Sequence, residues 1–492
     1  MNEESAEQPK PSETTSRLSH GKKSRIWILL LIALAVIVAG VLVYLSYFKS
    51  SDEDTSTGAK STTGVLSLDP VKEATHLSKV ADANNAYFRR GFDVVWNVME
   101  PSKGKYDWTE NDQMVQGSKD KSEGEIYNLS IIWPYANWDQ KSCHSGKEYI
   151  ATGHLKQGGE DLYMGVPCDL GAYGEFIQKV VERYDGDGVN DMPGLKTPVK
   201  YWEVLNEPSM HGGGIGGAGE DLKFFVGTSE EYLSILKTSY EAIKKADPKA
   251  KVLHAGMAGM QQNFRDFWDP IFAGGAGNYF DIANIHSIST TKETEDLFVI
   301  SFRKYLERFG ITGKPIWVTE AQYGSLQDEP EDKGEFEELM ARSTVFTLAQ
   351  DAEKIFLIEN WIFWGDKDSL NPDMDEKDKD KKEEKPKPDL SNNTTHKVYL
   401  NLLEKVNNFD SVEMLSEEFN QNPRDGAGAT TDIGQYEFIS GDKSVYVLWG
   451  ENSTVASEIS GKIKVTDIYG ASKEMDSNNL VITNSPVFVE KL

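Results

Sequence analysis

Cysteine is nearly absent from this chain of 492 residues, which contains only Cys143 and Cys168. Neither cysteine belongs to a CxxC pair or another ligand spacing that is typical of zinc proteins. The sequence therefore predicts no structural zinc site, and we expect no metal.

An excess of positive charge is also lacking. The chain has 79 acidic and 52 basic residues, which gives a formal net charge of −27. Because nucleic-acid phosphates would be repelled, the composition disfavours a nucleic-acid partner. Some of the acidic residues lie in charged runs such as 366–395, which lacks the mid-loop glycine of a calcium-binding EF-hand. We interpret this run as a solvated, charged insertion.

One long apolar run, Ile26–Phe48, contains no charged residue. As a helix it would be roughly 34 Å long, which is enough to cross a bilayer. Basic residues precede it and acidic residues follow it, so the N-terminus is expected in the cytoplasm. A cleaved signal peptide is the alternative, but its apolar core would be about half as long. We expect an uncleaved, single-pass signal anchor that leaves the rest of the chain extracytoplasmic.

An extracytoplasmic location permits a disulfide between Cys143 and Cys168, which would close one long loop. Two free thiols are the alternative that the sequence leaves open. We expect the disulfide.

The segments around the anchor are polar: residues 1–25 are predicted to be a disordered tail and 49–74 a flexible linker. From about 75 to 405, short apolar runs alternate with segments of helical periodicity. Strands are expected at 91–96, 126–133, 199–205, 251–255, 282–286, 315–319 and 354–363. Helices are expected at 176–184, 229–246, 297–309 and 336–349. This alternation predicts an α/β fold, a closed (β/α)₈ TIM barrel with a parallel sheet.

After residue 405 the pattern changes to short β-rich runs joined by Gly, Asn and Ser turns, among them SVYVLWG and GKIKVTDIYG. Residues 406–492 are therefore predicted to form a small C-terminal antiparallel β-sandwich domain.

Two glutamates follow apolar strand patterns in the predicted barrel. Glu207 ends the stretch YWEVLNEP, and Glu320 lies in IWVTEAQYG. Because the C-terminal ends of barrel strands converge on one face, both side chains are expected at one pocket. Glycoside hydrolysis needs such a pair, since one carboxylic acid protonates the leaving oxygen while the other attacks or activates water. Each glutamate alone fits a buried ion pair or a helix cap equally well.

Three stretches carry a family resemblance. WEVLNEP and WVTEAQYG resemble the two signature strands of the clan A glycoside hydrolases, which are retaining (β/α)₈ enzymes. FDVVWNVMEPSKGKYDW is similar to that clan's early segment ending in EP-x-x-G-x-Y-D-W, and VTDIYG and SPVFVEKL are similar to its accessory domains. The resemblance covers roughly residues 85 to 492.

The resemblance implies roles for particular residues. Glu207 corresponds to the general acid/base, Glu320 to the nucleophile and Asn206 to the amide that binds the sugar 2-hydroxyl. His286 lies where the clan often has His-x-Tyr. Here Ile288 occupies the position of the tyrosine, which commonly supports the nucleophile. Tyr323 is the candidate to replace it. The clan also places an arginine near the nucleophile, and either Arg89 or Arg90 would fill that role; the register leaves both open.

Besides polar side chains, sugar-binding sites use aromatic residues, because the apolar faces of sugars stack on flat rings. Trp133, Tyr135 and Trp138 lie at and just beyond an expected strand end. Trp361 and Trp364 lie on and at the end of the last expected strand, where the clan commonly has a tryptophan under the reacting sugar, and Trp364 is favoured because it is closer to the C-terminal end.

The run GIGGAG at 214–219 matches GxGxxG, but no suitably placed acid lies on a following strand, so we interpret it as a loop beside the site. The sequence thus predicts a membrane-anchored retaining glycosidase that acts on a β-linked oligo- or polysaccharide without a cofactor. Transglycosylation by the same residues and a non-catalytic carbohydrate-binding protein on a decayed barrel remain the alternatives.

Overall fold

The computed structural model describes residues 65–68, 88–117, 127–150, 162–196, 198–210, 223–289, 294–323, 332–357, 393–407 and 409–492. Across these residues no helix has both the length and the apolar character needed to span a bilayer. The anchor predicted at 26–48, the glycine run 214–219 and all but the end of the charged insertion lie outside the described residues, so these three expectations stay predictions.

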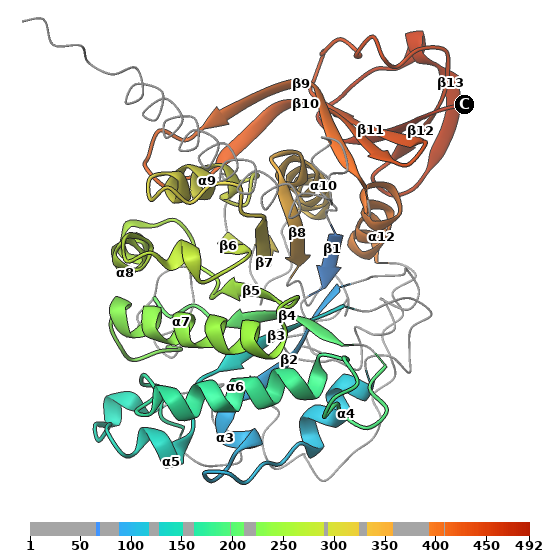
Figure 1. The fold of residues 1–492 in the computed structure, drawn as a ribbon. Helices are drawn as coiled ribbons and strands as arrows, with labels where there is room; N and C mark the ends of the chain where they lie inside the picture. The colour runs from blue at the N-terminus through green and yellow to red at the C-terminus, as the bar shows by residue number, and fades with distance from the viewer. Residues whose placement is uncertain are drawn as a thin grey trace, which may run out of the picture. The chain divides into compact units, whose positions relative to one another are not determined.

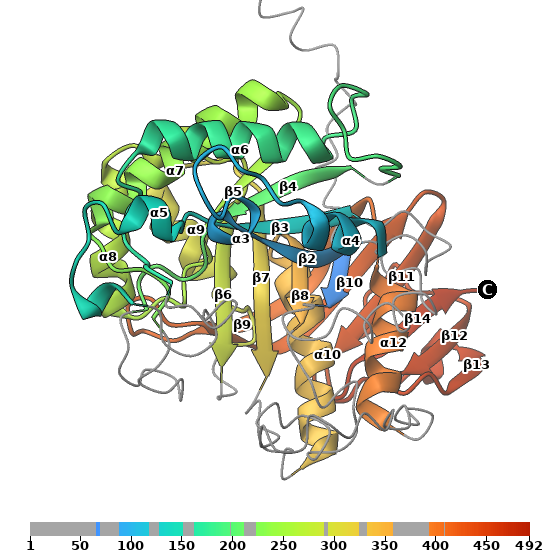
Figure 2. The ribbon, with the colours of Figure 1, turned by 90° about the horizontal axis from the view of Figure 1, so that it is seen from below.

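Eight parallel strands form the main sheet, in the order β5-β4-β3-β2-β1-β8-β7-β6. They are β1 (Val65–Leu68), β2 (Phe88–Val95), β3 (Tyr127–Trp133), β4 (Val199–Val204), β5 (Lys251–His254), β6 (Ala283–Ser289), β7 (Ile316–Tyr323) and β8 (Ala352–Leu357). Parallel bridges from Leu253 to Ile282 and from Met257 to Ile285 join β5 to β6. The sheet therefore closes on itself as a barrel, as the sequence predicted (Figures 1 and 2).

Helices follow the strands in turn and cover the outside of the barrel (Figure 2). They are α4 (Thr109–Gly117), α6 (Leu170–Tyr184), α7 (Ser229–Ala246), α8 (Gln262–Ala273), α9 (Val299–Glu307), α10 (Lys333–Ala349) and α12 (Thr394–Val406), after β2 to β8 respectively. The short helix α3 (Trp96–Met99) follows β2 directly, and α5 (Asn137–Gln140) begins four residues after the end of β3. Local sequence fixes the starts: Thr228 and Glu231 form a capping box at α7, and Asp169 caps α6.

The prediction was wrong at the N-terminal edge of the barrel. The linker expected over 49–74 contains β1, which pairs with β8 from Val65↔Lys354 to Leu68↔Leu357 and with β2 at Leu68↔Arg89. A four-residue strand whose neighbours are polar gives too short an apolar run to stand out from a linker. Arg89 and Arg90, expected just before the next strand, lie within β2.

Residues inside the barrel are arranged by the alternation of the strands. An apolar cluster fills one level and consists of Leu129, Leu253, Ile282, Trp317 and Phe356, with Tyr201 packed against it. Two positions further along their strands, Glu203 on β4 and Thr319 on β7 share the inward-facing side, and Asn284 on β6 bonds to both of them. A buried polar level therefore lies on the apolar one, on the side of the C-terminal strand ends.

The C-terminal region forms one six-stranded antiparallel sheet, in the order β13-β12-β14-β11-β10-β9. Its strands are β9 (Ser411–Gln421), β10 (Ala429–Ser440), β11 (Lys443–Trp449), β12 (Lys462–Asp467), β13 (Ser472–Asp476) and β14 (Val487–Lys491). The antiparallel strands predicted for this region are present, but the two stacked sheets of a sandwich are not seen among the described residues. The reason is that β14 pairs with both β11 and β12 and so joins all six strands into a single sheet.

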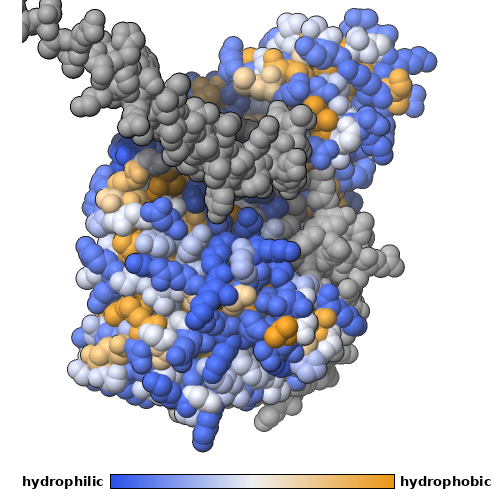
Figure 3. All heavy atoms as spheres, in the orientation of Figure 1, coloured by the Kyte–Doolittle hydropathy of each residue, from blue (hydrophilic) through white to orange (hydrophobic). Residues whose placement is uncertain are grey.

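Two buried acids at the start of α9 hold the sheet against the barrel. Glu295 accepts hydrogen bonds from the backbone N–H and hydroxyl of Thr431, and Asp296 accepts one from the N–H of Ala429. Burial raises the pKa of Asp296 to about 6. The remaining surface is largely hydrophilic on the face shown in Figure 3, with apolar residues scattered over it.

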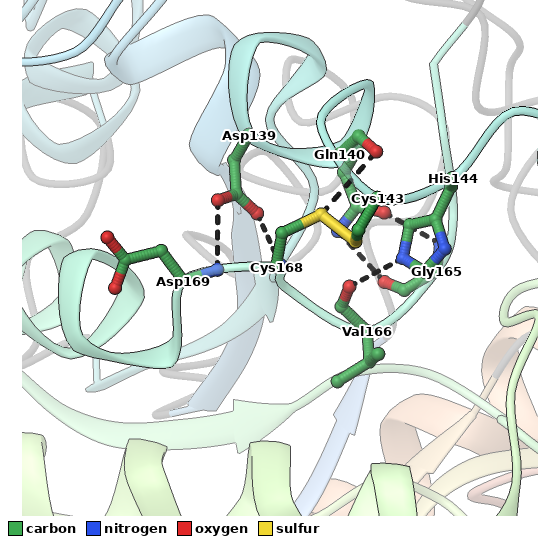
Figure 4. Close-up of a disulfide and its surroundings, with 8 residues drawn as sticks. All are labelled: Asp139, Gln140, Cys143, His144, Gly165, Val166, Cys168 and Asp169. Carbon is green, nitrogen blue, oxygen red and sulfur yellow. Dashed lines mark hydrogen bonds between the residues drawn. A yellow bond between two sulfur atoms is a disulfide. The ribbon is translucent and has the colours of Figure 1, made fainter.

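The predicted disulfide between Cys143 and Cys168 is confirmed, with Cα atoms 5.9 Å apart (Figure 4). It ties the segment after α5 to the start of α6. The carboxylate of Asp139 accepts the N–H groups of Cys168 and Asp169, so the crosslinked loop is also fixed by hydrogen bonds. The disulfide therefore stabilises the loop between β3 and α6, at the rim where the C-terminal ends of the strands lie.

Candidate active site

The chain changes direction abruptly after β4. Leu205 has φ of 70° and Glu207 has φ of 37°, so both adopt a left-handed conformation that side chains with a Cβ rarely take. Such strain costs of order 1–3 kcal/mol per residue and persists only where surrounding contacts enforce it. The turn brings Asn206 and Glu207 into the protein interior, where they are 7% and 3% exposed.

A β-bulge re-aims the second glutamate. Between Val318 and Glu320 strand β7 has one residue more than β6, because Ile285 pairs with Val318 while His286 pairs with Glu320. In a regular strand Thr319 and Glu320 would point to opposite faces. Here both approach the imidazole of His286, as expected for a bulge that redirects a side chain.

His286 lies between the two glutamates. Its Nδ1 is 2.8 Å from Glu207 Oε1 and 3.4 Å from Glu320 Oε2, and the imidazole is fully buried. One carboxylate oxygen of each glutamate and one imidazole nitrogen all lie within 4.8 Å of one another. The three side chains that the sequence placed on separate strands therefore meet at one point.

The donor and the acceptor in the hydrogen bond between His286 and Thr319 follow from a carbonyl oxygen, that of His254, which can only accept a hydrogen bond. Asn284 Nδ2 donates to the carbonyl of His254 at 3.3 Å, so its Oδ1 faces Thr319 and accepts the hydroxyl proton at 2.8 Å. Since the single hydroxyl proton of Thr319 is used there, its oxygen must accept from His286 Nε2, which lies 2.9 Å away. His286 therefore carries a proton on Nε2.

This assignment leaves Nδ1 to interact with Glu207. If the imidazole is neutral, Nδ1 accepts a proton from a protonated Glu207; if it is charged, Nδ1 donates to a Glu207 carboxylate. In both arrangements one proton is shared between Glu207 and His286. The buried network thus keeps a transferable proton between Glu207 Oε1 and His286 Nδ1, and this nitrogen is also 3.4 Å from Glu320 Oε2.

Glu203 is a member of this network that the sequence analysis missed. It is fully buried on β4, and its Oε1 accepts from Asn284 Nδ2 at 2.9 Å and from the N–H of Gly256 at 3.3 Å. Its Oε1 is also 3.9 Å from His286 Nε2. The sequence could have indicated this, because Glu203 is two residues after Tyr201 on β4. Side chains alternate between the two faces of a strand, so Glu203 points into the barrel as Tyr201 does.

The predicted sugar-binding aromatics divide into different groups. Trp133 ends β3 on its inward-facing side, is 5% exposed, and has an indole N–H without a hydrogen-bond partner in the described chain. Tyr135 is fully buried and donates its hydroxyl proton to the carbonyl of Phe224, so it is a structural residue rather than a sugar platform.

Trp138 packs edge-on against Trp96 and donates its indole N–H to the carbonyl of Glu100. It therefore joins α5 to α3, a structural role that the sequence did not predict. Position 323 is the last residue of β7, but the Tyr323 side chain lies outside the described part of the structure, as do Trp361 and Trp364. Their expected roles stay predictions.

Three sets of described side chains are compact enough to ligate a cation. In the set of Cys143, His144 and Cys168, both sulfurs are used in the disulfide. Asp185, Asp187 and Asp191 follow α6, where Asp185 and Asp191 accept backbone N–H groups of their own loop. The third set is Glu207, His286 and Glu320, whose geometry also fits acid–base chemistry.

Comparison with solved structures finds glycoside hydrolases whose fold resembles this parallel barrel, in which Glu207 follows the fourth strand and Glu320 lies in the seventh. A family 39 glycoside hydrolase from the gut symbiont Bacteroides cellulosilyticus WH2 superposes with a TM-score of 0.53 and 15% identity, covering 88% of this chain and 81% of that chain. A glucosidase from Croceicoccus marinus has a TM-score of 0.51 and 11% identity, covering 88% and 96% respectively.

At these identities the likeness concerns the fold. No protein-family model matches the sequence. A sequence search among curated proteins likewise gives no match.

Proposed function

We propose that the chain is a retaining glycoside hydrolase that cleaves β-linked O-glycosides by double displacement. The observation that supports this most strongly is the short distance between the carboxylates of Glu207 and Glu320, whose facing oxygens lie within 4.8 Å. Retaining enzymes hold their two carboxyl groups about 5–5.5 Å apart, whereas inverting enzymes leave roughly 6.5–9.5 Å for a water molecule. The spacing favours direct attack by one carboxylate.

In the first step a Glu320 oxygen attacks the anomeric carbon, and the bond to the leaving oxygen breaks as that oxygen takes the proton from Glu207. The product is a glycosyl ester on Glu320 and a free alcohol. In the second step Glu207, now ionised, removes a proton from water, and the water oxygen displaces Glu320 from the anomeric carbon. Two inversions leave the configuration unchanged.

The neighbouring residues suit these roles. Asn206 precedes Glu207 in the strained turn, and its amide is proposed to bind the sugar 2-hydroxyl more tightly in the transition state. His286 shares a proton with Glu207 and holds it beside the leaving oxygen. Trp133, at the end of β3, has an indole N–H without a hydrogen-bond partner in the described part of the chain and is proposed to contact the sugar.

The substrate class proposed is an oligo- or polysaccharide, in keeping with the glycoside hydrolase fold. The apolar segment 26–48 is proposed to anchor the chain in a membrane, with the barrel outside the cytoplasm. The disulfide between Cys143 and Cys168 supports an oxidising location for the barrel.

The experiment is hydrolysis of a panel of β-glycosides by the full chain in detergent, followed by proton NMR of the first sugar anomer released. The proposal requires a β-anomer at early times and loss of activity in Glu207→Gln and Glu320→Gln. Release of the α-anomer would contradict a retaining mechanism. Glycan binding without turnover in the wild type, unchanged in both variants, would show a non-catalytic carbohydrate-binding protein instead.

A further inference from the structure

A cavity of about 250 Å³ lies between the barrel and the hairpin that joins β9 to β10, away from the glutamate pair. Figure 1 shows this hairpin reaching over α9. Helices α8 and α9 supply one side of the cavity and the hairpin supplies the other. The two acids of the chain's central site do not line it.

Four cations line this cavity in a protein whose net charge is −27; they are Arg265, Lys304, Arg308 and Arg424. The acids that face them are fewer. Asp425 bonds to Arg265, and Asp269 lies 3.9 Å from Arg308 while it accepts a hydrogen bond from Tyr305. The cavity therefore has an excess of positive charge.

Two of the cations have no counter-ion among the residues that the structure describes. The side chains of Lys304 and Arg424 make no hydrogen bond or ion pair with any residue in the described parts of the chain. Both are exposed and both line the cavity. Four cations gathered around one small space repel one another, and an anion placed among them would relieve that repulsion.

Arg265 provides a second and independent observation. Its side chain is 6% exposed, and its Nε–H has no hydrogen-bond partner in the described structure. One terminal nitrogen donates to Asp425 and the other to Gln262. A buried guanidinium donor without a partner is unfavourable, and a planar fork of N–H groups suits an oxyanion.

The size of the cavity limits the ligand. Its volume equals that of roughly eight water molecules at about 30 Å³ each, and it is smaller than the pockets of about 300–1,000 Å³ that hold drug-sized ligands. We propose that this cavity binds a small tetrahedral oxyanion, phosphate or sulfate, either free or carried by a sugar. The site is separate from the glycosidase centre and does not depend on the proposed activity.

The test is isothermal titration calorimetry of the full chain with sodium phosphate and sodium sulfate, with sodium chloride at matched ionic strength as the reference. The variant is Lys304→Gln/Arg424→Gln, which removes two exposed, unpartnered cations and should leave the fold intact. Its matched control is Lys237→Gln/Lys249→Gln, which removes the same charge from α7 and the loop after it.

The wild type and the control should bind phosphate or sulfate with equal affinity, and Lys304→Gln/Arg424→Gln should bind at least tenfold more weakly. Glu207→Gln should bind like the wild type. No heat beyond that of chloride, or equal affinity in the cavity variant, would overturn the proposal. Loss of binding in Glu207→Gln would also overturn it, since the anion would then lie in the glutamate site.

Glucose 6-phosphate and glucose 6-sulfate distinguish the source of the anion. Binding more than tenfold tighter than that of the inorganic ion would support a sugar-borne group, and equal binding would support the free ion. If the sugar esters bind unchanged to the cavity variant, they occupy another site and the proposal fails for them.

Discussion

The hydroxyl of Thr319 accepts the Nε2 proton of His286 at 2.9 Å, and this contact determines which nitrogen faces Glu207. Thr319 can accept only because its own proton is donated to Asn284 at 2.8 Å. Thr319→Val keeps the shape but removes the acceptor, so Nε2–H would lie buried without a partner. We expect kcat to fall about tenfold to hundredfold, as for the loss of one hydrogen bond of about 1–3 kcal/mol, with little change in KM.

Thr319→Ser is the matched control, because it restores the hydroxyl and should retain most of the activity. The measurement is kcat and KM between pH 4 and 9 for the three proteins. A purely structural role would lower activity equally at every pH. If kcat of Thr319→Val equals that of the wild type and depends on pH in the same way, this contact does not position His286.

Replacement of the two glutamates should have effects that depend on the leaving group. Glu207→Ala should lose about 10²–10⁴-fold in activity on natural glycosides, because general acid catalysis is worth that much. On a dinitrophenyl glycoside, whose leaving group needs no proton, its first step should be nearly unchanged. Glu320→Ala should lose activity on both substrates.

Added azide provides a further check on this assignment. In Glu207→Ala it should attack the glycosyl enzyme in place of water and restore turnover with formation of the β-azide. Equal losses for the two variants on both substrates, without rescue, would mean that the roles are assigned wrongly.

Loss of the disulfide should destabilise the barrel without changing the chemistry. Cys143 and Cys168 are separated by 25 positions, and closing a loop of that length contributes about 3.5 kcal/mol in the chain-entropy description. Cys143→Ser/Cys168→Ser should therefore unfold at lower urea concentration by about that free energy. A reducing agent should shift the wild type and leave the double variant unaffected; equal midpoints in all samples would contradict this.

Acid should weaken the fold through His254. This imidazole is fully buried, its Nδ1 donates to the carbonyl of Ala255, and its Nε2 accepts the N–H of Asn284. Burial lowers its pKa to about 3 from 6.5. Since the folded pKa is the lower one, the stabilisation is complete above pH 6.5. It is lost as the pH falls toward 3, by about 1.4 kcal/mol per pH unit.

His254→Gln keeps one donor and one acceptor but cannot titrate. Urea unfolding of both proteins at pH 7, 6, 5 and 4 should show a free energy of unfolding that falls more steeply in the wild type, by roughly that slope. Carboxylates such as Asp296 titrate in both proteins, so their contribution to the free energy of unfolding cancels when the two proteins are compared. Parallel curves would show that His254 is not held neutral.

The sequence was sufficient to predict the barrel and the glutamate pair for physical reasons that apply to long, periodic segments. Strands such as β3 (YNLSIIW) and β4 (VKYWEV) are rich in apolar and aromatic residues, and α7 begins with a capping box, so their local signals agree with the fold. The convergence of strand ends then brings Glu207 and Glu320 together without any knowledge of loops.

Other features depend on contacts that have no local signal. The bulge at Thr319 is visible only when β7 is paired with β6, and it is the bulge that lets Thr319 and Glu320 approach the same imidazole. β1 is four residues long and is stabilised by pairing with β8. The hydrogen bonds from Tyr135 and Trp138 to the carbonyls of Phe224 and Glu100 join segments far apart in the sequence, so no local pattern indicates them.

The most direct test of the central claim is covalent trapping. Full chain is incubated with a panel of 2-deoxy-2-fluoro-β-glycosyl fluorides, and its intact mass and then its peptides are measured. We predict one added glycosyl group, on the peptide that contains Glu320, absent in Glu320→Gln and still formed in Glu207→Gln. Labelling of Glu207 instead of Glu320, or glycoside turnover with inversion and no adduct, would contradict the account.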